Sequence, residues 1–189
     1  MINLEWQDLD DSAAAKLVEA VNGEAPFQLP KGKTTVKVAA VPFYDEYKFY
    51  SLADTTLPAP NERFMLYKPG DINLMNWTNE PIYRVNDKAP IKLDRKTVVT
   101  YAKFFFHYVR GQLGRFIIVE KPEEVSWLAA ATAEEKARVN EKLLPLAYKG
   151  IGRDNLFTLT GTVVFKNALF LTDIKIAPMD MNAFDSAMN

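Results

Sequence analysis

The chain has 189 residues and a formal net charge of −1, so its charge balance argues against a general nucleic-acid binder, and no apolar run is long enough to span a membrane. It contains no cysteine and one histidine, which excludes disulfides, thiol nucleophiles and cysteine-based metal sites. The N-terminal residues lack the basic and apolar regions of a secretory signal, and we expect a cytoplasmic protein with one globular domain over residues 1–189.

The first half of the chain combines a helix with several short strands. Residues 12–22 place their apolar side chains on one helical face, between good N-cap residues and a glycine typical of a helix end. Residues 34–54 are rich in strand-forming residues with a polar break, which predicts two strands joined by a loop. Short apolar runs at 64–68 and 81–85 predict two further strands.

Residues 96–110, which contain the single histidine, fit a helix better than a strand. At about 100° per residue, the polar side chains converge on an arc of roughly 80°, and all three phenylalanines lie on the remaining surface. This pattern predicts a helix that is buried over most of its circumference, capped by Asp94 and terminated by Gly111. The polar arc consists of Lys96, Thr100, Lys103, His107 and Arg110.

The segment after this helix predicts a strand and two helix starts. Residues 115–120 are typical of a short buried strand. Pro122 followed by two glutamates indicates the first helix start, and the spacing of Thr132 and Glu135 matches a capping box that opens the second. We expect Pro145 to end or kink this second helix.

The C-terminal part predicts a β-hairpin with its turn at Lys166 and Asn167. In this register Phe165 lies opposite Ala168, and a shift of one residue would mix the two faces. Asp173 lies opposite Thr160 on the more polar face, which favours a solvated or hydrogen-bonded aspartate over a catalytic one. The face expected to line the core consists of Phe157, Leu159, Val163, Phe170, Ile174 and Ile176.

These elements together predict an α+β fold. Strands and helices are interspersed without regular β-α-β alternation, and hairpin patterns occur at both ends of the chain. We expect a mainly antiparallel sheet with three to four helices, including one largely buried helix near 96–110 and a C-terminal β-hairpin.

His107 has none of the surroundings that catalysis by histidine requires. No carboxylate or nucleophile stands at helical spacing from it, and the nearby Lys103 and Arg110 disfavour the imidazolium form. We therefore expect a neutral and partly exposed side chain, and we predict no catalytic residue, no metal site and no cofactor.

Residues 84–115 carry the strongest charge asymmetry in the sequence. Eight basic residues are opposed only by Asp87 and Asp94, which gives this segment a charge of +6 and leaves −7 for the rest of the chain. Such a segment can attract an anionic partner, unless acidic residues from elsewhere fold back onto it. The candidate binding residues are Lys96, Lys103, His107 and Arg110, together with Trp77 and Arg84 as candidates for the lining of a small-molecule pocket.

A non-catalytic binding or protein-interaction domain is the function that these patterns favour. Its partner would be an anionic small molecule or an acidic protein, with no membrane association. The alternative is a small enzyme that uses carboxylates such as Glu120 or Asp173 in a cleft. The sequence leaves the identity of the ligand and the oligomeric state open.

Overall fold

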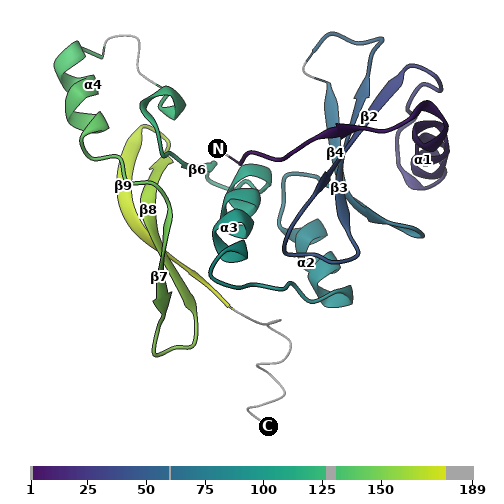
Figure 1. Cartoon of the computed structure of the whole chain (residues 1–189). Coiled ribbons are helices and arrows are strands. Elements are labelled where there is room, and N and C mark those ends of the chain that lie inside the picture. The colour runs from purple at the N-terminus through teal and green to yellow at the C-terminus, as the bar shows by residue number, and fades with distance from the viewer. Residues whose placement is uncertain (1, 60, 127–130, 178–189) are drawn as a thin grey trace. The chain divides into compact units, whose positions relative to one another are not determined.

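The computed structural model describes residues 2–59, 61–126 and 131–177, which divide into two compact units (Figure 1). One unit contains residues 3–90, and the other contains the chain from Ile91 onward together with Ile2. The single domain expected over residues 1–189 stays a prediction.

A five-stranded antiparallel sheet forms the centre of the first unit. Its strand order is β1-β2-β3-β4-β5, so that each strand pairs with its neighbour in sequence. The strands are β1 (Gln7–Asp8), β2 (Thr34–Ala40), β3 (Lys48–Asp54), β4 (Glu62–Lys68) and β5 (Asp71–Leu74). Two helices, α1 (Asp11–Glu24) and α2 (Glu80–Lys88), belong to the same unit.

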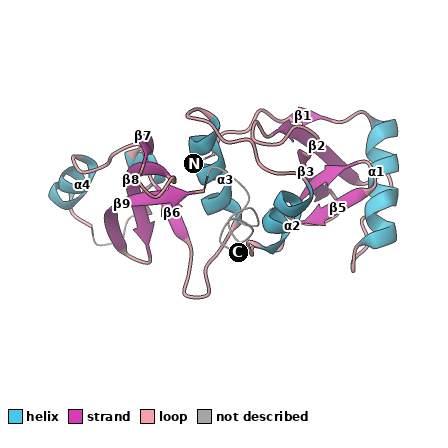
Figure 2. Cartoon of the chain, turned by 90° about the horizontal axis from the view of Figure 1, so that it is seen from below, coloured by secondary structure: helices cyan, strands magenta, loops and turns pink. Residues whose placement is uncertain are grey.

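Both faces of this sheet are covered. Helix α1 buries Leu17, Val18 and Val21 against Val36, Leu52 and Met65 on one face, and it lies on the opposite side of the sheet from α2 (Figure 2). On the other face, Phe49 and Phe64 stack with ring centroids 5.6 Å apart. Two-sided coverage explains why neighbouring residues of one strand are buried, instead of every second residue.

Residues 81–85 are not the strand that their apolar run predicted, because they lie within α2. Pro81 occupies the first turn of the helix, where backbone N–H groups have no intrahelical partner, so the missing N–H of proline costs no hydrogen bond. Ile82 and Val85, three residues apart, are both fully buried, whereas Tyr83 and Arg84 are exposed. A run of five residues is too short for its period to separate a helix from a strand.

The second unit is built on a four-stranded antiparallel sheet. Its elements are α3 (Thr97–Tyr108), β6 (Phe116–Ile118), α4 (Ala133–Asn140), β7 (Ala147–Ile151), β8 (Phe157–Phe165) and β9 (Ala168–Ile176). Strand β8 is central, because β9 pairs along its whole length while β7 and β6 pair with successive parts of it. Gly161 lies where these parts meet, and a Cβ atom there would stand 2.9 Å from the Leu146 Cα. The close approach of Leu146 therefore requires glycine at this position.

The register predicted for the C-terminal hairpin is confirmed over all nine residue pairs, from Phe165 with Ala168 to Phe157 with Ile176. Lys166 in the turn has a positive φ of 54°. Thr160 Oγ1 donates a hydrogen bond to Asp173, as the pairing predicted. Phe170 departs from the prediction, because it lies at the edge of the sheet and is 48% exposed instead of lining the core.

The largely buried helix predicted near 96–110 is confirmed as α3, with slightly shorter bounds. Asp94 accepts hydrogen bonds from the backbone N–H groups of Lys96 and Thr97, both at 2.7 Å, and so caps the helix as expected. The helix ends at Tyr108, before Gly111, and Arg110 therefore lies outside it. Every residue of α3 is buried or half-buried.

The two remaining helix predictions are confirmed in part. Pro122 begins a single 3-10 turn that ends at Glu124, and Thr132 forms the predicted capping box with Glu135 at the start of α4. Helix α4 ends at Asn140, so Pro145 is not what stops it.

The described residues thus form four α-helices and two antiparallel sheets, which is the α+β class that the sequence predicted. Within that part of the chain, no helix has both the length and the apolar character required to span a membrane.

Candidate functional site

A reversed turn after α3 brings Arg115 back beside His107. Gly114 donates a backbone hydrogen bond to Gly111 at 3.1 Å, and its φ of +137° lies in a region that other residues rarely adopt. After this turn, Arg115 Nη2 is 3.1 Å from His107 Nδ1. Two side chains that are eight positions apart in the sequence are therefore direct neighbours.

His107 is neutral and acts as the hydrogen-bond acceptor in this contact. A guanidinium group can only donate, so the Nδ1 atom of His107 carries no proton and the ring proton belongs to Nε2. Burial and the nearby charge of Arg115 lower the pKa of His107 to about 4. The predicted neutral, partly exposed histidine is confirmed, although the cationic side chain that lowers its pKa is Arg115 and not Lys103 or Arg110.

The positive charge of Arg115 is poorly compensated. The side chain is half-buried, and its Nε atom is buried without a hydrogen-bond partner. Burial and the neighbouring guanidinium of Arg110 lower the pKa of Arg115. In the described part of the chain, no carboxylate forms an ion pair with Arg115. We refer to His107, Arg110 and Arg115 as the Arg115 cluster.

Lys103, one turn before His107, is by contrast neutralised. Its Nζ atom lies 2.7 Å from Glu120 Oε2, and both side chains are largely buried. The other oxygen of Glu120 accepts a hydrogen bond from the backbone N–H of Leu146 at 3.1 Å. The solvated stripe expected along α3 is therefore wrong at Lys103, because Glu120, two residues after the end of β6, supplies a carboxylate.

Of the other candidate residues, Lys96 belongs to the same unit as the Arg115 cluster, and Trp77 and Arg84 belong to the other unit. Lys96 is exposed at the opposite end of α3 and follows the capping Asp94. Trp77 and Arg84 belong to the first unit, where both are exposed. Trp77 is 38% exposed with a positive φ of 67°, in a loop where Asn76 accepts hydrogen bonds from Thr78.

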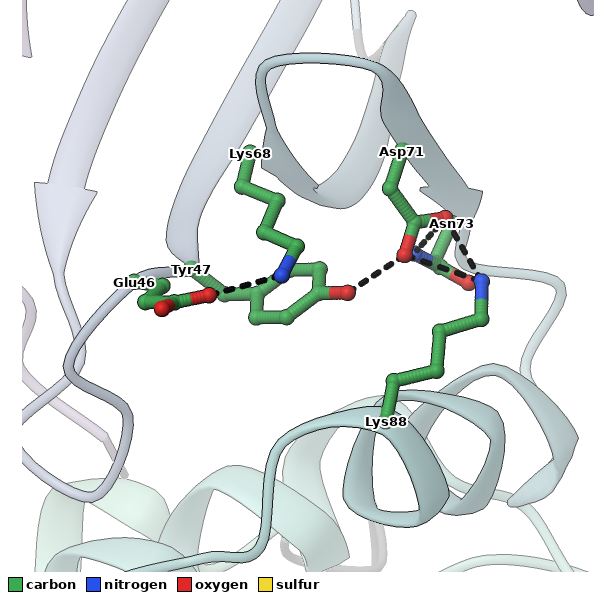
Figure 3. A network of polar contacts seen from close by, with 6 residues as sticks. All are labelled: Glu46, Tyr47, Lys68, Asp71, Asn73 and Lys88. Carbon is green, nitrogen blue, oxygen red and sulfur yellow. Dashed lines mark hydrogen bonds and ion pairs between the residues drawn. The ribbon is translucent and has the colours of Figure 1, made fainter.

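A second charged cluster, which the sequence patterns missed, is centred on Asp71 at the start of β5 (Figure 3). Lys88 Nζ lies 2.7 Å from one Asp71 oxygen, and the Tyr47 hydroxyl donates to the other. The side-chain amide of Asn73 also donates to Asp71, at 3.1 Å. We refer to Tyr47, Asp71, Asn73 and Lys88 as the Asp71 cluster.

The groups of the Asp71 cluster compensate one another. Burial alone would raise the pKa of Asp71, but the hydrogen bonds from Lys88 and Tyr47 outweigh burial and hold this pKa below its usual value. Burial and the bond to Asp71 raise the pKa of Tyr47, so the phenol stays protonated. Lys68, which pairs with Glu46 at 2.6 Å, stands over the Tyr47 ring (Figure 3). The cluster ties α2 and the loop before β3 to β5.

The sequence could not have indicated either cluster directly. Tyr47 and Asp71 are separated by 24 positions and Lys88 follows 17 positions later, so only the folded sheet brings them together. The G-x-x-G pattern at 111–114 was the one available sign of a turn next to His107. Among the residues that the structure describes, no group of histidine and acidic side chains could hold a metal ion.

Comparison with models of known protein families, with curated proteins and with solved structures finds no match to this chain.

Proposed function

We propose that this chain is a non-catalytic binding domain for an anionic small molecule or an acidic protein segment, and that the Arg115 cluster binds the anion. The observation that carries this proposal is the half-buried guanidinium of Arg115, which contacts a neutral imidazole and has a buried, unpartnered Nε atom. A buried charge without a counter-charge is costly, so an anion that pairs with it is bound with a gain in free energy.

The chemistry of the cluster suits an anion with several oxygen atoms. The five N–H groups of a guanidinium form a planar fork that matches carboxylate and phosphate oxygens. The repulsion between Arg110 and Arg115, which lowers the pKa of Arg115, decreases when a negative charge binds near both groups. The neutral His107 accepts from Arg115 and thereby orients its side chain.

The same geometry gives less support to the alternative of an enzyme that uses carboxylates. Glu120 is engaged by Lys103 and by the backbone of Leu146, and Asp173 is engaged by Thr160. A general base needs a free lone pair within reach of the substrate proton. A binding role requires a charged group that is incompletely paired, which the guanidinium of Arg115 provides.

The test is the thermal midpoint of unfolding in increasing sodium pyrophosphate, with sodium chloride at matched ionic strength as the reference. A ligand of the native state must raise the midpoint. We expect a saturable rise for the wild type and for Lys149→Gln, which removes an exposed lysine of β7, and no rise for Arg115→Gln. A midpoint that does not respond, or that rises equally in Arg115→Gln, would contradict the proposal.

A further inference from the structure

Strand β9 presents the longest open edge in the described part of the chain. It spans nine residues, pairs only with β8, and forms no hydrogen bond along its outer edge to any other described residue. The other strands at sheet edges, β1, β5, β6 and β7, have two to five residues. A long edge with unpaired N–H and C=O groups is a template for a further strand.

The hydrogen bonds of β8 determine which groups of β9 point outward. Thr162 of β8 donates its N–H to Leu144 and accepts from Val119, so both of its backbone groups point away from β9. Thr162 and its partner Leu171 therefore form a non-hydrogen-bonded pair, and the backbone N–H and C=O groups of Leu171 face the open edge. The alternation of an antiparallel ladder extends this orientation to Leu169, Asp173 and Lys175.

The side chains on β9 are also incompletely covered. Phe170 is 48% exposed and Leu171 is 63% exposed, and they lie on opposite faces of the sheet. The devices that commonly protect an edge strand, such as proline, bulges and several lysines, are sparse here, since Lys175 is the only lysine from 168 to 176 and no proline occurs there. A neighbouring strand would cover apolar surface on both faces at once.

Two β9 strands can pair antiparallel in one register that uses all nine residues and brings their outward backbone groups together. If two copies meet antiparallel with Thr172 opposite Thr172, then Phe170 faces Ile174 of the partner subunit, and Leu171 faces Asp173 of the partner subunit. Leu169 faces Lys175 of the partner subunit, and the outward backbone groups of each strand meet those of the other. No like charges stand opposite each other in this pairing, whereas centring it on Asp173 would oppose two carboxylates.

We propose that β9 is a homodimerisation edge, at which two copies of the chain pair antiparallel about a twofold axis at Thr172 and join their sheets. This pairing is isologous, so each contact occurs twice. The proposal rests on the open edge, its outward backbone groups and a register that matches these groups without opposing like charges, and it does not depend on the anion site.

The test uses the sign of one charge at Leu171, which faces Asp173 of the partner subunit in the proposed register. Sedimentation velocity over a concentration series gives the dimer dissociation constant for the wild type, Leu171→Glu and Leu171→Lys, with circular dichroism to check folding. Both variants lose the same exposed side chain, so they are matched controls for each other. In Leu171→Glu, each glutamate faces Asp173 of the partner subunit, so two pairs of like charges meet across the interface. We therefore expect this variant to dimerise at least about tenfold more weakly than Leu171→Lys.

A double variant tests the proposed register directly. In Leu171→Glu with Asp173→Lys, each glutamate faces a lysine, and we expect dimerisation to return to at least the strength of Leu171→Lys. A wild type that stays monomeric at every concentration would overturn the proposal. A dimer whose dissociation constant is the same in Leu171→Glu and Leu171→Lys would overturn it as well, because the interface would then lie elsewhere or in another register.

Discussion

Asp71 in the first unit and Arg115 in the second are both half-buried charged side chains, but their surroundings are opposite. Asp71 accepts hydrogen bonds from a lysine, a phenol and an amide. Arg115 contacts a neutral imidazole and is repelled by a second guanidinium. The first charge is satisfied by the fold, whereas the second is left with an unpartnered Nε atom.

We interpret this difference as one between a structural role for the Asp71 cluster and the binding role proposed for the Arg115 cluster. A charge that collects several partners from different elements stabilises the arrangement of those elements and has little capacity for a ligand. A buried charge without a counter-charge lowers the stability of the native state, and it is tolerated at sites that gain the missing partner from a ligand. Substitutions in the two clusters should therefore affect stability in different ways.

The largest effect is expected for Asp71→Ala. The substitution leaves the Tyr47 hydroxyl, on a side chain that is 1% exposed, and the buried Asn73 amide without their acceptor, which should cost about 2–4 kcal/mol of unfolding free energy. The pair with the 45% exposed Lys88 adds little to this cost. Denaturant unfolding provides the measurement, and the exposed Glu62→Ala should change stability by less than about 0.5 kcal/mol.

The stability that Asp71 contributes should decrease at acidic pH, because the pKa of Asp71 is lowered in the folded state. The folded state holds this carboxylate ionised at pH values where the unfolded chain, with a pKa near 3.8, takes up a proton. The contribution is therefore complete well above pH 3.8 and is lost as the pH falls through the folded pKa. The stability difference between wild type and Asp71→Ala should shrink below pH 4, and a difference that stays constant down to pH 2 would contradict this origin.

A smaller effect is expected for Tyr47→Phe, which removes one donor from Asp71 and keeps the aromatic ring. We expect a loss of about 1–2 kcal/mol, because Asp71 retains its bonds from Lys88 and Asn73. A loss as large as that of Asp71→Ala would mean that the phenol alone sustains the cluster. Chemical denaturation of both variants under the same conditions distinguishes these outcomes.

His107 should give the second unit a dependence on pH in a different window. Its folded pKa of about 4 lies below the ordinary value of 6.5, so between these values the unfolded chain binds the extra proton. Stability should therefore fall as the pH drops from 6.5 towards 4. In His107→Gln, which keeps an acceptor for Arg115, this component should be absent, and an unchanged pH profile would refute the assignment.

The smallest effect on stability is expected for Arg115→Gln. Removal of a poorly compensated charge should change the unfolding free energy by no more than about 0.5 kcal/mol, or should stabilise the protein. A loss above about 2 kcal/mol in ligand-free buffer would show that the guanidinium has partners that satisfy it, and would remove the contrast with Asp71.

Local patterns were sufficient for the hairpin and for α3. Alternation over β8 and β9 fixed the nine-pair register, and the period of residues 96–110 identified the buried helix. At 81–85 the apolar run was too short to distinguish the period of a helix from that of a strand. Its proline occupies the first turn of α2, where the helix accommodates it. Phe170 shows a further limit, because alternation assigns a residue to a face but does not reveal where the covering layer ends.

The charged clusters lay beyond sequence reasoning for a different reason. Lys103 was expected on a solvated stripe, but Glu120, 17 positions later, neutralises it after the chain has reversed direction. The contact of Arg115 with His107 depends on the turn at Gly114, whose conformation the sequence only suggested. Pairings between distant segments are determined by the fold and leave no periodic signal in either segment.

The most direct test of the anion site is the NMR signal of the Arg115 side-chain Nε–H during a titration with sodium phosphate at constant ionic strength. The atom is buried and unpartnered, so an anion that binds the guanidinium should shift this signal saturably, with the His107 ring signals following the same binding curve. Arg84, exposed on α2, serves as the internal reference and should shift little. An Arg115 signal that does not move, or that moves linearly in step with Arg84, would contradict the account.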